Sequence, residues 1–403
     1  MTQPVPAAPD ATAPPKNMGM VSAIAISLSG MMGSGLYSVL GYANLTAGTH
    51  IPIAFFAASL AVFFTVYSFA KLSATYPGRG GGPAGFMQTC YGDGFVSGWM
   101  NLFMCLGFLL ATSLYASSCT DFISVLAGPS LSPGQLKVIG SVVVVLFAMI
   151  NLLGASIVGR AASVIIGLVF LALIAFATKG MTRMDFGTMQ WKGGTLEGIA
   201  VATGMLYINF QGFAVVTSAA QSMADPRKML PRAMYIAVTL ITILYITVSW
   251  VAIQITPHTE IVQHAGDILG EAAQIIAGKT GFIIIVISAL LACVAAVNAT
   301  IFIAAKVFTF VVGQHPEAKA LARLVGTGSA RPLLISSGIV IVLVLGFPLV
   351  AVGKMASMAF LLIFGVISFG HLRIRKQTGA AAPLLWIGIV INGMLFTSLF
   401  INA

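Results

Sequence analysis

Apolar residues gather into segments of about twenty along the whole chain, and short polar stretches separate these segments. A membrane-spanning α-helix needs about 20 consecutive apolar residues, because the hydrocarbon core of a bilayer is about 30 Å thick. The pattern therefore predicts an all-α integral membrane protein with about eleven transmembrane helices, near residues 18–43, 51–73, 86–114, 134–155, 158–178, 195–221, 232–256, 281–307, 332–348, 352–373 and 382–401.

The composition supports a membrane location. Of the 403 residues, 58% are hydrophobic and only 7% are charged, whereas soluble domains carry about 25% charged residues. A water-soluble core cannot enclose so much apolar surface, so the lipid bilayer is the expected surrounding. The four cysteines lack the paired spacing of a metal site, and we expect neither a metal nor a cofactor.

The net charge of +10 is explained by topology. Cytoplasmic loops of membrane proteins hold an excess of Lys and Arg. If the N-terminus is cytoplasmic, the outer side of the membrane holds, of the twenty basic residues, only Lys137, Lys179, Arg183, Lys192, Lys279 and Lys354. This distribution predicts a protein of the cytoplasmic (inner) membrane with its C-terminus outside, and it requires no nucleic-acid partner.

The predicted spans divide the chain into four parts. Residues 1–17, rich in Pro and Ala, are expected to form a disordered cytoplasmic tail. Residues 18–178 and 179–373 each contribute five spans, and residues 374–403 add an eleventh helix. Because five is an odd number, the two halves are expected to lie in the membrane with opposite orientations.

The first span contains the stretch SGMMGSGLYSVLG at residues 29–41. Glycines in a membrane helix usually let another helix approach closely. The alternative is a deliberate break, in which backbone N–H and C=O groups lose their intrahelical partners. For this stretch alone, close packing and a functional break are equally favoured.

The sixth span favours the break. Its middle reads Tyr207-Ile208-Asn209-Phe210-Gln211-Gly212, which puts two amides and a glycine at mid-membrane depth. Buried amides are costly without partners, so they are expected to face a cavity or the bundle interior. Interrupted spans at matching positions of two inverted halves indicate a transporter's central site.

Broken helices suit a zwitterionic ligand. The N–H groups of Gly33, Ser34 and Gly35 at the positive end of a half-helix suit a carboxylate. Unwound carbonyls over residues 208–211 suit an ammonium group. A molecule with both charges on one carbon is expected to bridge the two breaks.

These motifs resemble the amino acid–polyamine–organocation superfamily, whose members share the LeuT-like 5+5 inverted repeat with unwound helices 1 and 6. GMMGSGLYSVLG is similar to its first-helix motif, and residues 67–103, with Pro-x-x-Gly-Gly and Gly-Trp pairs, to its second and third helices. Residues 204–233 are similar to its sixth helix and following loop. The resemblance covers about residues 18–373.

The resemblance implies secondary active transport of an amino acid or related amine by alternating access. It assigns the substrate carboxylate to Met32, Gly33, Ser34 and Gly35. It assigns the amino group to Ile208, Asn209 and Gln211, and it makes Phe210 or Tyr207 an aromatic gate. The family's frequent Glu near the end of the sixth helix is replaced here by Gln221 and Ser222, and Phe170 lies near the position of a fifth-helix lysine in some proton-coupled members.

Three further polar residues each have two alternative roles, one in the site and one in helix packing. Asn101 lies on the third span, where it either lines the site or packs helices. Asn298 and Thr300, on the eighth span, either contact the substrate or a cation through oxygen atoms or serve packing. The coupling ion, proton or sodium, stays open, as do exchange and the oligomeric state.

The sequence thus predicts a permease for a small amino acid or amine. The alternative is a polar-lined solute or ion channel, which needs a continuous pore and a filter sequence that is not seen. An intramembrane enzyme needs a nucleophile and base or a metal set at membrane depth, and no such cluster occurs in the sequence.

Overall fold

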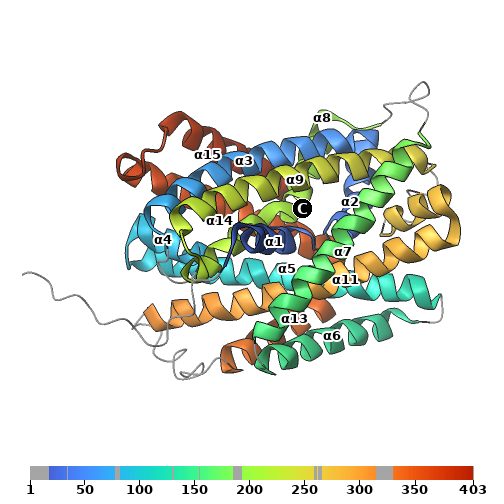
Figure 1. Cartoon of the computed structure of the whole chain (residues 1–403), viewed down its shortest axis with the longest axis horizontal. Coiled ribbons are helices and arrows are strands. Elements are labelled where there is room, and N and C mark those ends of the chain that lie inside the picture. The colour runs from blue at the N-terminus through green and yellow to red at the C-terminus, as the bar shows by residue number, and fades with distance from the viewer. Residues whose placement is uncertain are drawn as a thin grey trace, which may run out of the picture.

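The eleven predicted spans are all helical in the computed structural model, which describes residues 18–33, 35–77, 82–128, 131–153, 155–184, 193–257, 261, 266–314 and 330–402 (Figure 1). Over these ranges the chain forms no strand. They include nine helices long and apolar enough to cross a membrane, besides two shorter apolar helices, Met20–Met31 and Ala330–Gly346. The predicted fold class, an all-α membrane protein, is confirmed.

The helices follow the predicted spans in order. They are α1 (Met20–Met31), α2 (Gly35–Ala47), the short 3-10 helix η1 (Gly48–His50), α3 (Ile51–Thr75), α4 (Pro83–Tyr91), α5 (Phe95–Ala127), α6 (Pro133–Leu153), α7 (Ala155–Met181), α8 (Leu196–Leu206), the 3-10 helix η2 (Tyr207–Ser222), α9 (Pro226–Ile255), α11 (Ile268–Gln314), α13 (Ala330–Gly346), α14 (Leu349–Thr378) and α15 (Ala382–Ile401). Together α1 and α2 form the first span, and α8 with η2 forms the sixth.

Two helix boundaries differ from those predicted. The third span was expected over 86–114, but α5 starts only at Phe95 and continues to Ala127, and α4 is a separate short helix. Gly92, with φ at 72°, ends α4 in a backbone conformation that side-chain-bearing residues avoid. The eighth span, expected over 281–307, lies within α11, which contains a non-helical residue at Gly278. Glycine conformation therefore sets boundaries that hydropathy cannot detect.

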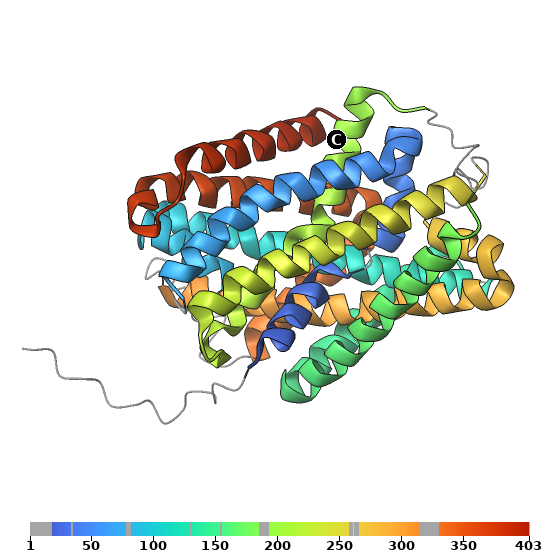
Figure 2. The same ribbon diagram turned by 45° about the horizontal axis from the view of Figure 1, so that its top comes forward.

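Spans five places apart in sequence order pack side by side. In the first and sixth spans, α1 packs against η2 and α2 against α8. The second span, α3, packs along α9, the seventh, and α5 of the third packs along α11 of the eighth (Figure 2). These pairings bring the two interrupted spans together in the bundle.

Burial separates central from peripheral helices. The α8–η2 segment and α5 are mostly buried inside the protein, whereas α6 and α15 are mostly exposed. Many of their exposed residues are large and apolar, such as Met149 on α6 and Met394 on α15. An outer surface of this kind is stable in lipid, where apolar side chains meet hydrocarbon.

Asp267, just before α11, makes the stability of the fold depend on pH. Burial, and secondarily the nearby Glu271, raise its pKa from 3.8 to about 7, against a backbone hydrogen bond from Gly270. Because the folded pKa is the higher one, folding favours the protonated acid, and this stabilisation is lost as the pH rises from about 4 through about 7. Asp267→Asn is expected to raise the thermal midpoint in detergent at pH 8 but not at pH 4. An equal change at both pH values contradicts this.

Candidate functional site

The first span is interrupted where the sequence predicts it. The α1 helix ends at Met31, and the Met32 N–H closes its last turn by bonding to the Leu28 carbonyl at 2.7 Å. The α2 helix starts at Gly35. Met32, Gly33 and Gly35 are all buried, and Ser34 lies outside the described residues. The first-turn N–H groups of α2 have no intrahelical partners, so the interruption exposes donors inside the bundle.

Gly30, in the stretch at residues 29–41, allows close packing of α1, which is one of the two roles expected for the glycines of this stretch. A Cβ on Gly212 of η2 would lie 1.8 Å from the Gly30 carbonyl carbon, and a Cβ on Gly30 would lie 2.8 Å from the Gly212 oxygen. The backbones of α1 and η2 therefore touch without an intervening side chain. The same motif thus includes a packing glycine as well as the break.

Gly33 and Gly35 face side chains instead of backbone. A Cβ on Gly33 would lie 2.8 Å from the Tyr115 ring of α5 and 3.1 Å from the Ala296 Cβ of α11. A Cβ on Gly35 would lie 1.8 Å from Asn209 Oδ1. The interruption is therefore enclosed by the third, sixth and eighth spans.

The sixth span is interrupted by a change of helix type. At Tyr207 the α-helical hydrogen bonding of α8 gives way to the 3-10 helix η2, which continues to Ser222. Carbonyls of a 3-10 helix accept from the residue three positions on, with poorer geometry than in an α-helix. Each carbonyl keeps a second lone pair. Residues 208–211 therefore keep accepting capacity without uncoiling.

The amides of Asn209 and Gln211 are buried with unused hydrogen-bonding capacity. Asn209 is 1% exposed, and neither Nδ2 nor Oδ1 has a hydrogen-bond partner. Gln211 is fully buried beside the Tyr115 hydroxyl, but its amide makes no hydrogen bond of normal geometry. Such buried polar groups in native proteins usually indicate a missing ligand or water. Asn209 Oδ1 lies against Gly35, so this unused capacity adjoins the start of α2.

Contacts at both ends of the interrupted spans enclose this region. At one end, the Met18 N–H donates to the Ser222 carbonyl at 3.0 Å, which joins the start of α1 to the end of η2. At the other end, Gly198 packs so closely on α2 that a Cβ there would lie 2.2 Å from the Thr46 carbonyl oxygen. The described residues thus show the interrupted spans in contact on both sides of the site.

The remaining predicted residues lie in several places. Tyr207 and Phe210 share the η2 segment but face different helices: the Tyr207 hydroxyl lies 3.1 Å from Thr65 Oγ1 of α3, and Phe210 packs on Tyr245 of α9. Ile208 is fully buried. Three polar residues bond other helices: Asn101 donates to the Ala84 carbonyl of α4, Asn298 accepts from Asn151 of α6, and Thr300 pairs with Thr112 of α5.

Two tyrosines at the site were missed from the sequence. Tyr115 lies one residue beyond the predicted end of the third span, at 114, whereas α5 continues to Ala127. Tyr245, on α9, donates from its hydroxyl to the Met31 carbonyl at 2.8 Å, at the end of α1. A prediction that extended the third span beyond residue 114 would have included Tyr115. No local sequence pattern distinguishes Tyr245 from other residues of its span.

Tyr245→Phe is expected to destabilise the protein by about 1 kcal/mol, since it leaves the buried Met31 carbonyl without its partner. The measurement is the thermal midpoint in detergent. Tyr235→Phe on the same helix, whose ring stacks on Phe63, is the control. If both variants lose the same stability, the hydrogen bond to α1 has no specific role.

Comparison with known proteins identifies the family. Residues 18–403 match the amino acid permease family. The chain belongs to this family. Its members are transporters rather than enzymes, which confirms the predicted class, and the family favours a carrier over a channel. The permease is a multi-pass membrane protein.

Three relatives are similar in sequence to this permease. Two of them match it over most of their own length, and the third matches it over about half. An uncharacterized protein of Methanocaldococcus jannaschii is 24% identical over 96% of this chain and 89% of its own. The inner membrane transport protein YbaT of Escherichia coli is 24% identical over 95% of this chain and 90% of its own. The branched-chain amino acid permease BcaP of Bacillus subtilis is 24% identical over 61% of this chain and 56% of its own.

Proposed function

We propose that this permease carries a neutral, zwitterionic amino acid across the cytoplasmic membrane as a secondary active transporter. The observation that carries the proposal is the buried, unpartnered amide of Asn209 beside the start of α2. A ligand that pairs with this amide and with the free N–H groups of α2 removes the cost of burying them. An amino acid supplies both kinds of partner: its carboxylate accepts from the N–H groups, and its ammonium group donates to the amide oxygen.

The proposed binding mode follows from the charges of backbone groups. The substrate carboxylate accepts from N–H groups around Gly33 and Gly35, at the positive end of α2. Its ammonium group donates to Asn209 Oδ1 and to carbonyls of residues 208–211. The sequence-based assignment of Ser34 as a further donor is part of this proposal.

The substrate side chain is expected to be uncharged. Tyr115 and Ala296 lie against Gly33, and Gln211 lies beside Tyr115. None of them carries a charge that could pair with a second cation, and an unpaired charge at this depth is costly. The name of the relative BcaP supports branched-chain amino acids as the first compounds to test.

Alternating access is proposed to move one group of core helices, the bundle, relative to another group, the hash. The pairing of spans five places apart supports a repeat whose halves, 18–178 and 179–373, interlock and both contribute to the moving parts. The positive-inside charge distribution supports a cytoplasmic position for Met18 and Ser222.

Uptake by purified protein in liposomes tests the function. Labelled leucine is expected to accumulate with saturable kinetics, and unlabelled leucine or valine to compete, whereas arginine and putrescine do not. The measurement is repeated with sodium or proton gradients, which identifies the coupling ion. Linear, non-saturating flux would show a channel instead, and competition by arginine alone would refute the neutral substrate.

A further inference from the structure

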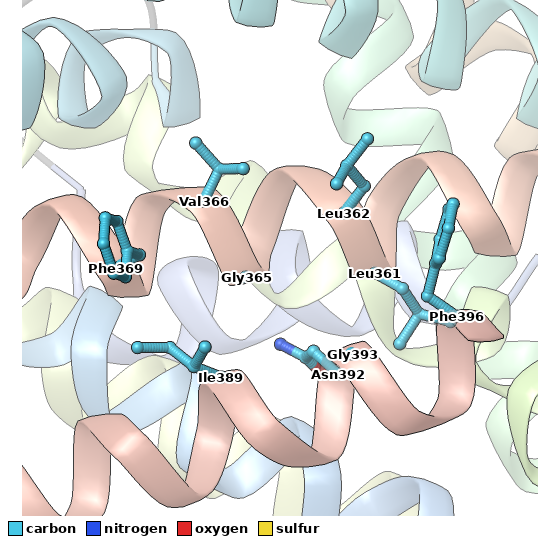
Figure 3. Close-up of a pocket in the computed structure, with 9 residues that line it drawn as sticks. All are labelled: Leu361, Leu362, Gly365, Val366, Phe369, Ile389, Asn392, Gly393 and Phe396. Carbon is cyan, nitrogen blue, oxygen red and sulfur yellow. The ribbon is translucent and has the colours of Figure 1, made fainter.

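A groove between α14 and α15 points to no particular ligand (Figure 3). Its volume is about 240 Å³, and its one polar side chain, Asn392, is buried and donates to Thr65 Oγ1 of α3 at 3.2 Å. A larger groove of about 370 Å³, the α5–α13 groove, lies where α5, α11 and α13 pack together. Its walls are mostly apolar and include Trp99, Leu106, Leu109, Phe308, Ile335 and Ile339.

The α5–α13 groove is open to the bilayer along one leaflet. Trp99 is 55% exposed, and Leu106 and Ile339 are exposed as well. Along α5 the lining residues extend from Trp99 to Leu109, a distance of about 15 Å at 1.5 Å per residue. One leaflet contributes half of a hydrocarbon core that is about 30 Å thick. The groove therefore has the length that an acyl chain of one leaflet can follow.

The groove begins near one membrane surface. Trp99 is the fifth residue of α5 (Phe95–Ala127), and Ile335 is the sixth of α13 (Ala330–Gly346). Because the third and ninth spans are six places apart, both helices begin on the same side. The Trp99 ring packs on Phe95 with 5.8 Å between centroids, and exposed aromatic rings of this kind are typical of the headgroup level. The positive-inside charge distribution supports the cytoplasmic leaflet for this end.

Arg331 adds a positive charge at this end of the groove. It is exposed and lies one turn before Ile335, on the same face of α13. Side chains of a helix lean toward its N-terminus, so the guanidinium extends from the groove toward the headgroups. The α13 helix contains no Asp or Glu, and within the residues that the structure describes the one ion pair joins Lys228 and Asp225. Arg331 is therefore available to an anion of the membrane.

We propose that the α5–α13 groove binds an anionic phospholipid, with one acyl chain along the groove and the phosphate paired with Arg331. The apolar walls accept the chain of any phospholipid, and the cation selects the headgroup. A zwitterionic headgroup brings its own positive charge close to Arg331, whereas a headgroup with a net negative charge does not. A second copy of the chain is a poorer occupant, because a two-fold contact at the groove would bring two Arg331 side chains together.

Photolabelling of the full chain in liposomes tests this proposal. The probes are phosphatidylglycerol and phosphatidylcholine, which carry the same diazirine in one acyl chain. Mass spectrometry is expected to find adducts on the lining segments of α5 and α13, about fivefold more with phosphatidylglycerol, the equivalent of about 1 kcal/mol for one basic residue. Equal labelling of these segments by the two lipids, adducts spread evenly over exposed helices such as α6, or cross-links to a second copy in their place would overturn the proposal.

Matched variants separate the charge from the groove. Arg331→Gln is expected to reduce phosphatidylglycerol labelling to the level of phosphatidylcholine, whereas Arg375→Gln, which removes an exposed cation of α14, keeps the fivefold preference. Ile339→Trp is expected to fill the groove and reduce labelling by both lipids. Val342→Trp, at a 66% exposed position of the same helix outside the groove lining, leaves it unchanged. A preference that survives Arg331→Gln contradicts the phosphate contact, and unchanged adducts in Ile339→Trp contradict the location.

Discussion

Gly35→Ala is expected to raise the KM for uptake about a hundredfold while leaving the protein folded. The new methyl group would lie 1.8 Å from Asn209 Oδ1. This oxygen is the end of a side chain, so the amide can rotate away at small cost. Rotation removes the amide from the start of α2, and displacement of a binding group by about 1 Å can cost about a hundredfold.

Uptake kinetics and the thermal midpoint in detergent are measured together for this variant. The control is Gly167→Ala on α7, where nothing lies within 4 Å of the added Cβ, and it should match the wild type in both. If Gly35→Ala transports normally, the site does not lie at the interruption of the first span. A parallel fall of midpoint and activity would instead show a packing role.

Gly212→Ala is expected to act on stability, because its methyl group meets backbone. The added Cβ would lie 1.8 Å from the Gly30 carbonyl carbon and 2.0 Å from its oxygen. Neither atom can rotate away, so α1 and η2 must separate. Overpacking of this kind costs about 3 kcal/mol, which corresponds to a fall in the thermal midpoint of roughly 3–4 °C for a chain of 403 residues.

Gly353→Ala on α14 is the control for this packing prediction. Its Cβ would lie 3.5 Å from Leu114, an ordinary contact, so the midpoint should stay within about 1 °C of the wild type. A Gly212→Ala protein with unchanged midpoint would mean that the two backbones are not in contact. Paired with Gly35→Ala, the Gly212→Ala variant separates a proposed binding glycine on α2 from a packing glycine on η2.

Hydropathy predicted the helices well and their ends less well. The order of the spans and the all-α fold class follow from the recurrence of apolar segments of about twenty residues, because the thickness of the bilayer fixes this length. The start of α5 at Phe95 depends instead on the backbone of Gly92, and hydropathy carries no dihedral information. The helix then continues to Ala127, and its residues stay largely buried inside the protein as far as Phe122.

The candidate site was predictable in its backbone and less so in its side chains. Gly33, Gly35 and Asn209 share two sequence motifs, and the structure brings them together. Asn298 and Thr300 looked similar in sequence, but they bond neighbouring helices, since only the rotation of α11 decides which face a residue occupies. Tyr245 contacts α1 across 214 positions, a distance at which a single sequence gives no signal.

The 3-10 geometry of η2 has a mechanical consequence. Its 16 residues rise about 2.0 Å each and span about 32 Å, whereas an α-helix of the same residues spans about 24 Å. Rewinding η2 into an α-helix would therefore shorten the sixth span by about 8 Å.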